Sequence, residues 1–169
     1  MFKEIDITSV KENFIDAIAN EWFLVAAGDE NKFNMMTASW GFVGQMWNKN
    51  SAITVIRPTR YTKEFVDNND LFTISFLGED AKKSVHSVCG KLPGREVDKC
   101  KETGLNPVFK DDTVFFDKAR LVLVCTKMYV SEIRHECFID KNLDEQFYND
   151  DYHIAYVGEI VKCYINEDN

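Results

Sequence analysis

The sequence has no long apolar stretch and no basic N-terminal segment. A membrane-spanning helix needs about 18 or more consecutive apolar residues, and no window approaches that length. Residues 1–6 include acidic side chains where a secretory signal would have a basic end followed by an apolar core. We therefore expect no membrane contact and a cytoplasmic location.

Clusters of positive charge are also missing. The formal net charge is −8, and no run of Lys or Arg exceeds two residues. Binding to the phosphate backbone of a nucleic acid needs a basic patch, so nucleic acid is not expected as a partner. The length of 169 residues and the hydrophobic fraction of 45 % are sufficient for one compact domain.

Familiar cysteine patterns and catalytic motifs are absent as well. The five cysteines are scattered and form no C-x-x-C pair, which argues against a disulfide framework and against a metal site. The sequence has no G-x-S-x-G, H-E-x-x-H, P-loop or dinucleotide-binding glycine motif. Hydrolysis and nucleoside-triphosphate chemistry therefore lack support.

Short β-branched and aromatic runs dominate what is present. Strands are predicted over residues 22–27, 33–40, 51–57, 71–77, 115–133 and 154–165. The first two strands are separated by a turn-like segment, which predicts a hairpin. The third ends at Pro58, which cannot donate a hydrogen bond to a sheet. An acidic loop is expected over residues 140–151.

Helical signals occur at three places between these strands. Ser9 begins a capping box ahead of apolar residues at helical spacing, and Thr62 is expected to cap a helix over residues 63–68. Residues 79–104 predict a helical insert of two short helices around a loop. Strands and helices do not alternate, so a sandwich or a barrel is expected. We favour a mainly β fold, a β-barrel with peripheral helices.

A polar segment, residues 34–41, ends the first predicted hairpin. In an extended chain Thr37, Ser39 and Gly41 share one face beside Trp40, and small side chains there would let a flat ring approach the backbone. The same pattern fits an ordinary strand whose polar residues face water while the tryptophan packs inside. This segment alone does not decide between the two interpretations.

A second polar segment, residues 57–62, leads into the predicted helix. Its two arginines are suited to bidentate contact with phosphate, and the free N–H groups of a helix start also favour an anion. It is a candidate phosphate site. The alternative is a solvated loop whose arginines pair with carboxylates of this acidic protein.

Four segments in order resemble elements of the flavin reductase-like family of FMN-binding split barrels, in particular its flavoredoxin branch. Residues 34–41 are similar to the family's N-x-M-T-x-S-W, and residues 57–62 to its R-x-x-R-Y-T. Residues 89–99 resemble G-x-x-S-G-R-x-x-D-K, and residues 151–160 resemble D-H-x-x-x-x-G-E-V. The resemblance implies one FMN-binding split-barrel domain over residues 1–169 and a homodimer with the flavin near its interface.

The resemblance also implies which residues contact FMN. The ring would be lined by Met36, Thr37, Ala38, Ser39 and Trp40. The phosphate would be held by Arg57, Thr59, Arg60 and Thr62, with Tyr61 among them. The insert would bring Lys91, Arg95, Asp98 and Lys99 toward the site, unless they serve only in capping and a salt bridge. His153 matches a histidine near the flavin or nicotinamide, although a lone histidine at a strand start is often a local hydrogen-bonding group.

Three functions are compatible with this interpretation. In the first, NAD(P)H reduces bound FMN, which passes electrons to an acceptor; this chemistry needs no general base because the flavin performs the redox step. In the second, the protein is a flavoredoxin-type electron carrier that has no nicotinamide site and exchanges electrons with a redox partner protein. In the third, the barrel binds no flavin and has a structural or binding role.

Overall fold

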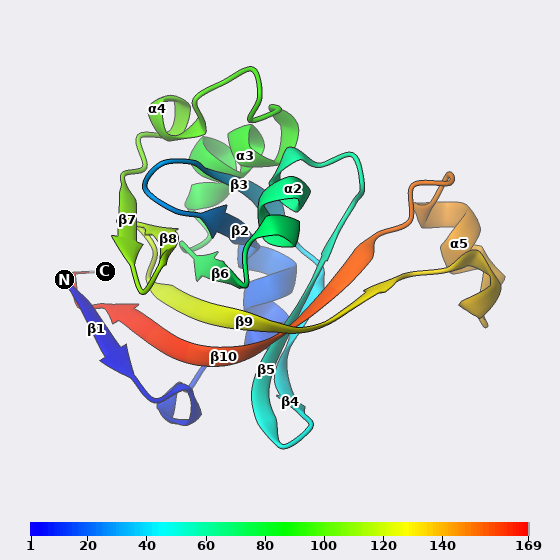
Figure 1. The fold of residues 1–169 in the computed structure, drawn as a ribbon, viewed down its shortest axis with the longest axis horizontal. Helices are drawn as coiled ribbons and strands as arrows, with labels where there is room; N and C mark the ends of the chain where they lie inside the picture. Colours follow the sequence, from blue (N-terminus) through cyan, green and yellow to red (C-terminus); the bar gives the residue numbers. More distant parts are fainter. Residues whose placement is uncertain (169) are drawn as a thin grey trace.

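Antiparallel strands form the main part of the structure, a computed structural model that describes residues 1–168 (Figure 1). The strands are β1 (Phe2–Ile5), β2 (Phe23–Gly28), β3 (Phe33–Ala38), β4 (Gly41–Met46), β5 (Lys49–Ile56), β6 (Leu71–Phe76), β7 (Pro107–Lys110), β8 (Thr113–Phe116), β9 (Leu121–Glu132) and β10 (Ile154–Asn166). The main sheet has the order β3-β2-β6-β9-β10-β5-β4, with β1 paired to β10, and β7 and β8 form a separate hairpin. This path ends at β3 and β4, which are consecutive in the chain, and β1 is a further edge strand beside β10.

Short helices lie outside the sheet. They are α1 (Phe14–Asp16), which continues as a π-helical turn (Ala17–Glu21), α2 (Tyr61–Asn68), α3 (Ser87–Lys91), α4 (Lys99–Thr103) and α5 (Lys141–Phe147). A second π-helical turn (Lys82–His86) precedes α3, and single 3-10 turns occupy Ile7–Ser9 and His135–Cys137. Helix α2 packs on β2 and β3, and α3 packs on β3. No helix within residues 1–168 is long and apolar enough to cross a membrane.

Strand β2 is buried along its whole length because both of its faces are covered. Phe23 and Val25 point into the barrel core, whereas Leu24 and Ala26 pack in a second cluster that includes Val85 from the insert. A strand covered on both faces has a continuous apolar sequence instead of alternating polarity. This explains the unbroken apolar run over residues 22–27.

The register of β10 with β9 shifts between Val157 and Gly158. A Cβ atom at Gly158 would lie 2.8 Å from the ring of Phe72 and 2.8 Å from Cβ of Cys125. The absence of a side chain therefore lets β10 cross close to the core. From its start near α5, β10 runs back along β9 to this point (Figure 1).

The ends of β9 and β10 extend beyond the barrel and carry α5 at their tip (Figure 1). We call residues 133–153 the arm. Ile139 is 98 % exposed, and Leu143 and Phe147 on α5 are also exposed. The arm thus presents apolar side chains on an element that projects from the sheet.

Two predicted helix caps are wrong. The first helix is capped by Asn13, whose side chain accepts a hydrogen bond from the N–H of Asp16 at 3.3 Å. Ser9 lies in the preceding 3-10 turn, where its hydroxyl donates to the carbonyl of Asp6 at 2.7 Å. In α2 the cap position is Arg60, without a side-chain cap bond, so Thr62 lies inside the helix.

Two predicted segments also differ. The strand expected over 115–133 is interrupted between β8 and β9, because the N–H of Ala119 closes a turn onto the carbonyl of Phe116 at 3.0 Å. The expected loop over 140–151 contains α5, which Asp140 caps by accepting from the N–H of Asn142 at 3.0 Å. The other predicted strands and the two short helices within 79–104 are found.

Candidate functional site

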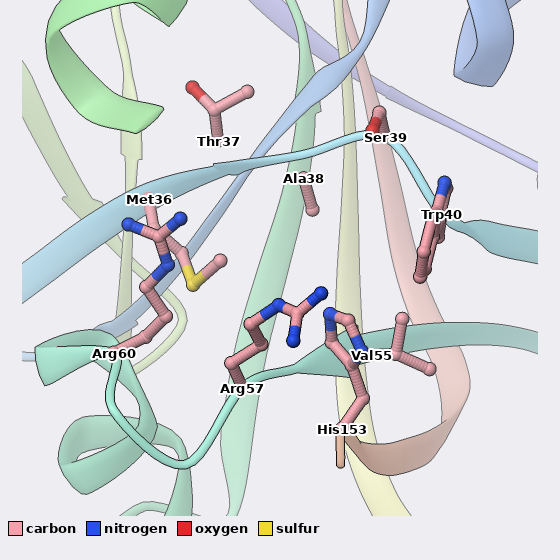
Figure 2. Close-up of a pocket in the computed structure, with 9 residues that line it drawn as sticks. All are labelled: Met36, Thr37, Ala38, Ser39, Trp40, Val55, Arg57, Arg60 and His153. Carbon is pink, nitrogen blue, oxygen red and sulfur yellow. The ribbon is translucent and has the colours of Figure 1, made fainter. Parts of the chain in front are cut away.

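A pocket of about 190 Å³ lies where the end of β3 meets the end of β5 and the start of β10 (Figure 2). It is lined by Met36, Thr37, Ala38, Ser39, Trp40, Val55, Arg57, Arg60 and His153. Residues from three of the four resembling segments thus meet in one place. Val55 is the lining residue that the sequence analysis did not name.

The free edge of β3 forms one wall of the pocket. Every second residue of an edge strand directs its N–H and C=O away from the sheet. The carbonyl of Met35 is such a group, since it accepts a hydrogen bond from Nζ of Lys99 at 2.7 Å. The alternation then places the N–H and C=O of Thr37 on the same edge, at the pocket wall. A ligand can hydrogen-bond to this backbone without displacing a strand.

The side chain of Thr37 points away from the pocket and contacts the helical insert (Figure 2). Its Oγ1 lies 2.9 Å from Nδ1 of His86, a residue that is 2 % exposed. Burial lowers the pKa of His86 to about 4, so the ring is neutral at pH 7. The pair anchors the pocket wall to the insert. The sequence analysis missed this role of His86, because nothing in the sequence marks its contact with Thr37.

The two arginines of the pocket have different surroundings. The guanidinium group of Arg57 contacts the carboxylate of Asp151 at 2.5 Å and donates to the carbonyl of Phe147 at 2.9 Å, so the arm already engages it. The hydrogen bond with Arg57 holds the pKa of Asp151 below its usual value. Arg60 donates to the carbonyl of Gly90 at 2.9 Å. Of the two, Arg60 keeps more of its five donors for a ligand.

The start of α2 lies next to these arginines but outside the pocket lining. Thr59 is exposed in the loop before the helix. Thr62 is buried, and its hydroxyl accepts a hydrogen bond from the amide of Asn34 at 2.8 Å. Tyr61 packs on Phe65 with ring centroids 5.1 Å apart. These side chains shape the loop. The N–H of Lys63 donates to the carbonyl of Arg60 at 3.0 Å, so within residues 1–168 the N–H groups of Tyr61 and Thr62 are the ones at this helix start that an anion can reach.

His153 and Trp40 form the opposite side of the pocket (Figure 2). Their ring centroids are 5.2 Å apart. His153 is 9 % exposed, and burial together with Arg57 lowers its pKa to about 4. Nδ1 of His153 lies 3.0 Å from the hydroxyl of Tyr148 in the arm. Trp40 is 40 % exposed, so its indole is accessible to a ligand.

The four candidate residues of the insert do not line the pocket. Lys99 is buried and donates to the carbonyls of Met35 and Cys89. Asp98 caps α4, and Arg95 pairs with Glu64 and lies 4.2 Å from the centroid of the Tyr61 ring. Lys91 is exposed at the end of α3. Capping and ion pairing within the chain thus account for Asp98 and Arg95.

The sequence was compared with models of known protein families. Residues 15–169 match the model of the family described as "Flavin reductase like domain". The chain belongs to the flavin reductase-like family. The family predicted from the four sequence segments is therefore confirmed. No curated protein matches the chain.

Solved structures with the same fold include members described as flavin proteins. A flavoredoxin from Methanosarcina acetivorans is 20 % identical, with a TM-score of 0.68 over 98 % of this chain and 76 % of that one. A putative flavin reductase with a split barrel domain from Shewanella frigidimarina is 18 % identical, with a TM-score of 0.66 over 96 % and 78 %. An NADH:FAD oxidoreductase from Streptomyces globisporus is 13 % identical, with a TM-score of 0.64 over 88 % and 77 %. The predicted mainly β split barrel is confirmed.

Proposed function

We propose that this flavin reductase-like protein binds FMN in the pocket and transfers electrons through it. The observation that carries the proposal is the convergence of a free strand edge and two arginines on one pocket, with the start of α2 beside it. A flat ring with hydrogen-bonding edges suits the backbone of Thr37, and a phosphate suits Arg60 and the start of α2. Relatives described as flavoredoxin and FMN-binding protein support the same ligand.

The chemical character of the pocket fits this ligand. Arg57 and Arg60 give one end of the pocket positive charge in a protein whose net charge is −8. Trp40, Ala38 and Val55 give the remaining wall small or apolar surface. Pockets commonly combine apolar walls with a few oriented polar groups. When bound, FMN would supply the redox chemistry.

The residues of the chain would bind and orient the ligand. The N–H of Thr37 can donate to a ring acceptor, and its carbonyl can accept from a ring N–H. Arg60 can hold the phosphate through charge-assisted hydrogen bonds. His153 is neutral at pH 7, so it would contribute a hydrogen bond and not a charge. No side chain is required as a general base for hydride transfer from NAD(P)H to a flavin.

A homodimer is part of the proposal. The pocket volume of about 190 Å³ falls below the roughly 300–1,000 Å³ typical of small-molecule sites, so a second subunit would complete the enclosure. Beside the pocket, Phe42 is 72 % exposed. At the turn between β4 and β5, Trp47 is also exposed, and its ring centroid lies 6.0 Å from that of the exposed Tyr129 on β9. Exposed apolar patches of this kind are typical of interaction surfaces. Light scattering should give twice the monomer mass of 19.6 kDa; a monomeric mass with FMN bound would contradict the dimer alone.

FMN binding can be tested directly. Purified protein should show flavin absorption in the visible range, or gain it when FMN is added and excess is removed. A ligand that binds the native state raises the unfolding temperature as its concentration increases. Riboflavin, which lacks the phosphate, is the matched control and should stabilise the protein much less. A protein that gains neither absorption nor thermal stability with FMN would refute the proposal.

The source of the electrons separates the reductase from the carrier. We propose that NAD(P)H reduces the bound flavin directly, because the exposed indole of Trp40 leaves the pocket open to a second flat ring. The alternative is a flavoredoxin-type carrier, favoured by the acidic surface that would suit a basic redox partner protein. Mixing FMN-loaded protein with NADH or NADPH without oxygen should bleach the yellow colour. Persistent colour with both would favour the carrier.

A further inference from the structure

The two ring nitrogens of His153 have different environments. Nδ1 lies 3.0 Å from the hydroxyl of Tyr148. Nε2 has no hydrogen-bond partner within residues 1–168, and neighbouring atoms do not enclose it completely. Because His153 lines the pocket, Nε2 is the nitrogen that a pocket ligand can reach.

The direction of the hydrogen bond follows from the chemistry of the two groups. Burial raises the pKa of Tyr148 above its usual value, so its hydroxyl keeps the proton at pH 7. His153 is neutral at that pH and carries one ring proton. An unprotonated imidazole nitrogen is a much stronger acceptor than a phenol oxygen. The Tyr148 hydroxyl therefore donates to Nδ1, and the ring proton lies on Nε2.

We propose that Tyr148 is a positioning residue that holds His153 in the Nε2–H tautomer and so gives the pocket a neutral hydrogen-bond donor. The ligand atom it selects is an acceptor, such as a carbonyl oxygen or an unprotonated ring nitrogen. Its assignment to a flavin edge rests on the proposed function. The tautomer itself does not depend on that function.

Packing within the arm fixes the Tyr148 ring. Tyr152 stacks on it with ring centroids 4.9 Å apart and an angle of 18° between the planes. Phe138 lies 5.6 Å from it, and the guanidinium carbon of Arg57 lies 5.4 Å from its centroid. These contacts leave the hydroxyl aimed at His153. The donor in the pocket is thus set by a residue outside it, on the arm.

The first test reads the tautomer without any ligand. A long-range ¹H–¹⁵N spectrum at pH 7 distinguishes the protonated from the unprotonated ring nitrogen of each of the three histidines. The His153 signals are assigned by their loss in His153→Gln. We expect Nε2–H in the unmodified protein and a mixture of tautomers in Tyr148→Phe. Tyr152→Phe is the matched control, because it removes a hydroxyl from the stacked ring without touching His153.

Two outcomes would overturn the proposal. One is an Nδ1–H tautomer in the unmodified protein, a measurement that needs no variant to fold. The other is an unchanged tautomer in Tyr148→Phe. Either result leaves FMN binding unaffected, whereas absence of FMN binding with an Nε2–H tautomer would refute only the proposed function.

The second test uses FMN as the probe. FMN binding selects the Nε2–H tautomer, so if Tyr148→Phe leaves about half of the His153 rings in that tautomer, the FMN dissociation constant should rise about twofold. Tyr152→Phe should leave it unchanged. A Gln at position 153 can donate an amide N–H without help from Tyr148. In the His153→Gln background, the effect of Tyr148→Phe should therefore disappear. An equal effect in both backgrounds would show a merely structural role and refute the proposal.

Discussion

Replacing Arg60 with Ala is the sharpest perturbation of the proposed phosphate site. Arg60 lines the pocket and has donors left after its bond with Gly90, while Arg57 is engaged by Asp151 and Phe147. A hydrogen bond to a charged group contributes about 1.5–3 kcal/mol. At about 1.4 kcal/mol per tenfold, Arg60→Ala should raise the FMN dissociation constant about 10- to 150-fold.

Arg60→Ala should destabilise the folded protein only slightly. The hydrogen bond from Arg60 to the carbonyl of Gly90 contributes about 1 kcal/mol, which corresponds to a decrease of about 2–4 °C in the unfolding temperature of a protein of this size. Affinity is measured by quenching of FMN fluorescence, and the fold by circular dichroism. Arg60→Lys keeps the positive charge but lacks the planar guanidinium group. Its FMN dissociation constant should therefore lie between those of the unmodified protein and Arg60→Ala.

A matched control removes an arginine elsewhere. Arg134 is exposed on the arm and pairs with Glu136, so Arg134→Ala should leave FMN affinity unchanged. If Arg60→Ala binds FMN as tightly as Arg134→Ala, the phosphate does not lie at Arg60. The same comparison with riboflavin should show little difference between the two variants, since riboflavin has no phosphate for Arg60 to bind.

Three further changes test the packing around the site. The pKa of His86 is about 4 in the folded protein and about 6.5 unfolded, so this residue should make the free energy of unfolding decrease by up to about 3 kcal/mol as the pH is lowered from about 6.5 to 4. His153 has a similarly lowered pKa, so His86→Asn should remove one part of the pH dependence in denaturant titrations and leave the part due to His153. Gly158→Ala should lower the free energy of unfolding by about 1–3 kcal/mol in denaturant titrations, because its Cβ would meet Phe72. Asp151→Asn should release Arg57 and tighten FMN binding by up to about fivefold in fluorescence titrations, since a partly exposed ion pair contributes about 0–1 kcal/mol.

The positions of β2, β3, β5, β6, β9 and β10 were predictable from the sequence because their signal is local, whereas β1, β4 and β7 were not predicted. Val, Ile and Phe runs mark β5, β6 and β10, and Pro58 ends the third run as expected. Caps were less predictable, because several polar residues compete near each helix start. Ser9 and Asn13 both precede the first helix, and the structure uses Asn13 since the 3-10 turn already holds Ser9.

The arm shows why α5 was not expected. Its sequence is acidic and short, and in isolation a helix of seven residues has little stability. In the structure Asp140 caps it, and Asp144 is buried against His135. Those contacts depend on the turn that places residues 135 and 144 side by side. Sequence periodicity carries no information about such a tertiary contact.

The sequence named eight of the nine residues that line the pocket, but it did not indicate the separate contacts of the two arginines. In the sequence, Arg57 and Arg60 are equivalent candidates for a phosphate contact, because they lie three positions apart in one segment. The structure separates them, since the arm supplies Asp151 and the Phe147 carbonyl to Arg57 and leaves Arg60 for a ligand. Likewise Lys99 resembles a ligand-binding lysine, yet burial between two carbonyls uses its donors.

The arm contacts two polar side chains of the pocket, the cation Arg57 and the neutral His153. Through Asp151 and Phe147 it holds the cation Arg57, and through Tyr148 it orients the neutral donor His153. A shift of the arm would therefore change the charge and the hydrogen-bonding of the pocket together. Because the arm also carries exposed apolar side chains such as Ile139, a second subunit that covers it would stabilise one geometry of both groups. In this interpretation dimer formation completes the enclosure of the pocket and also fixes its polar groups.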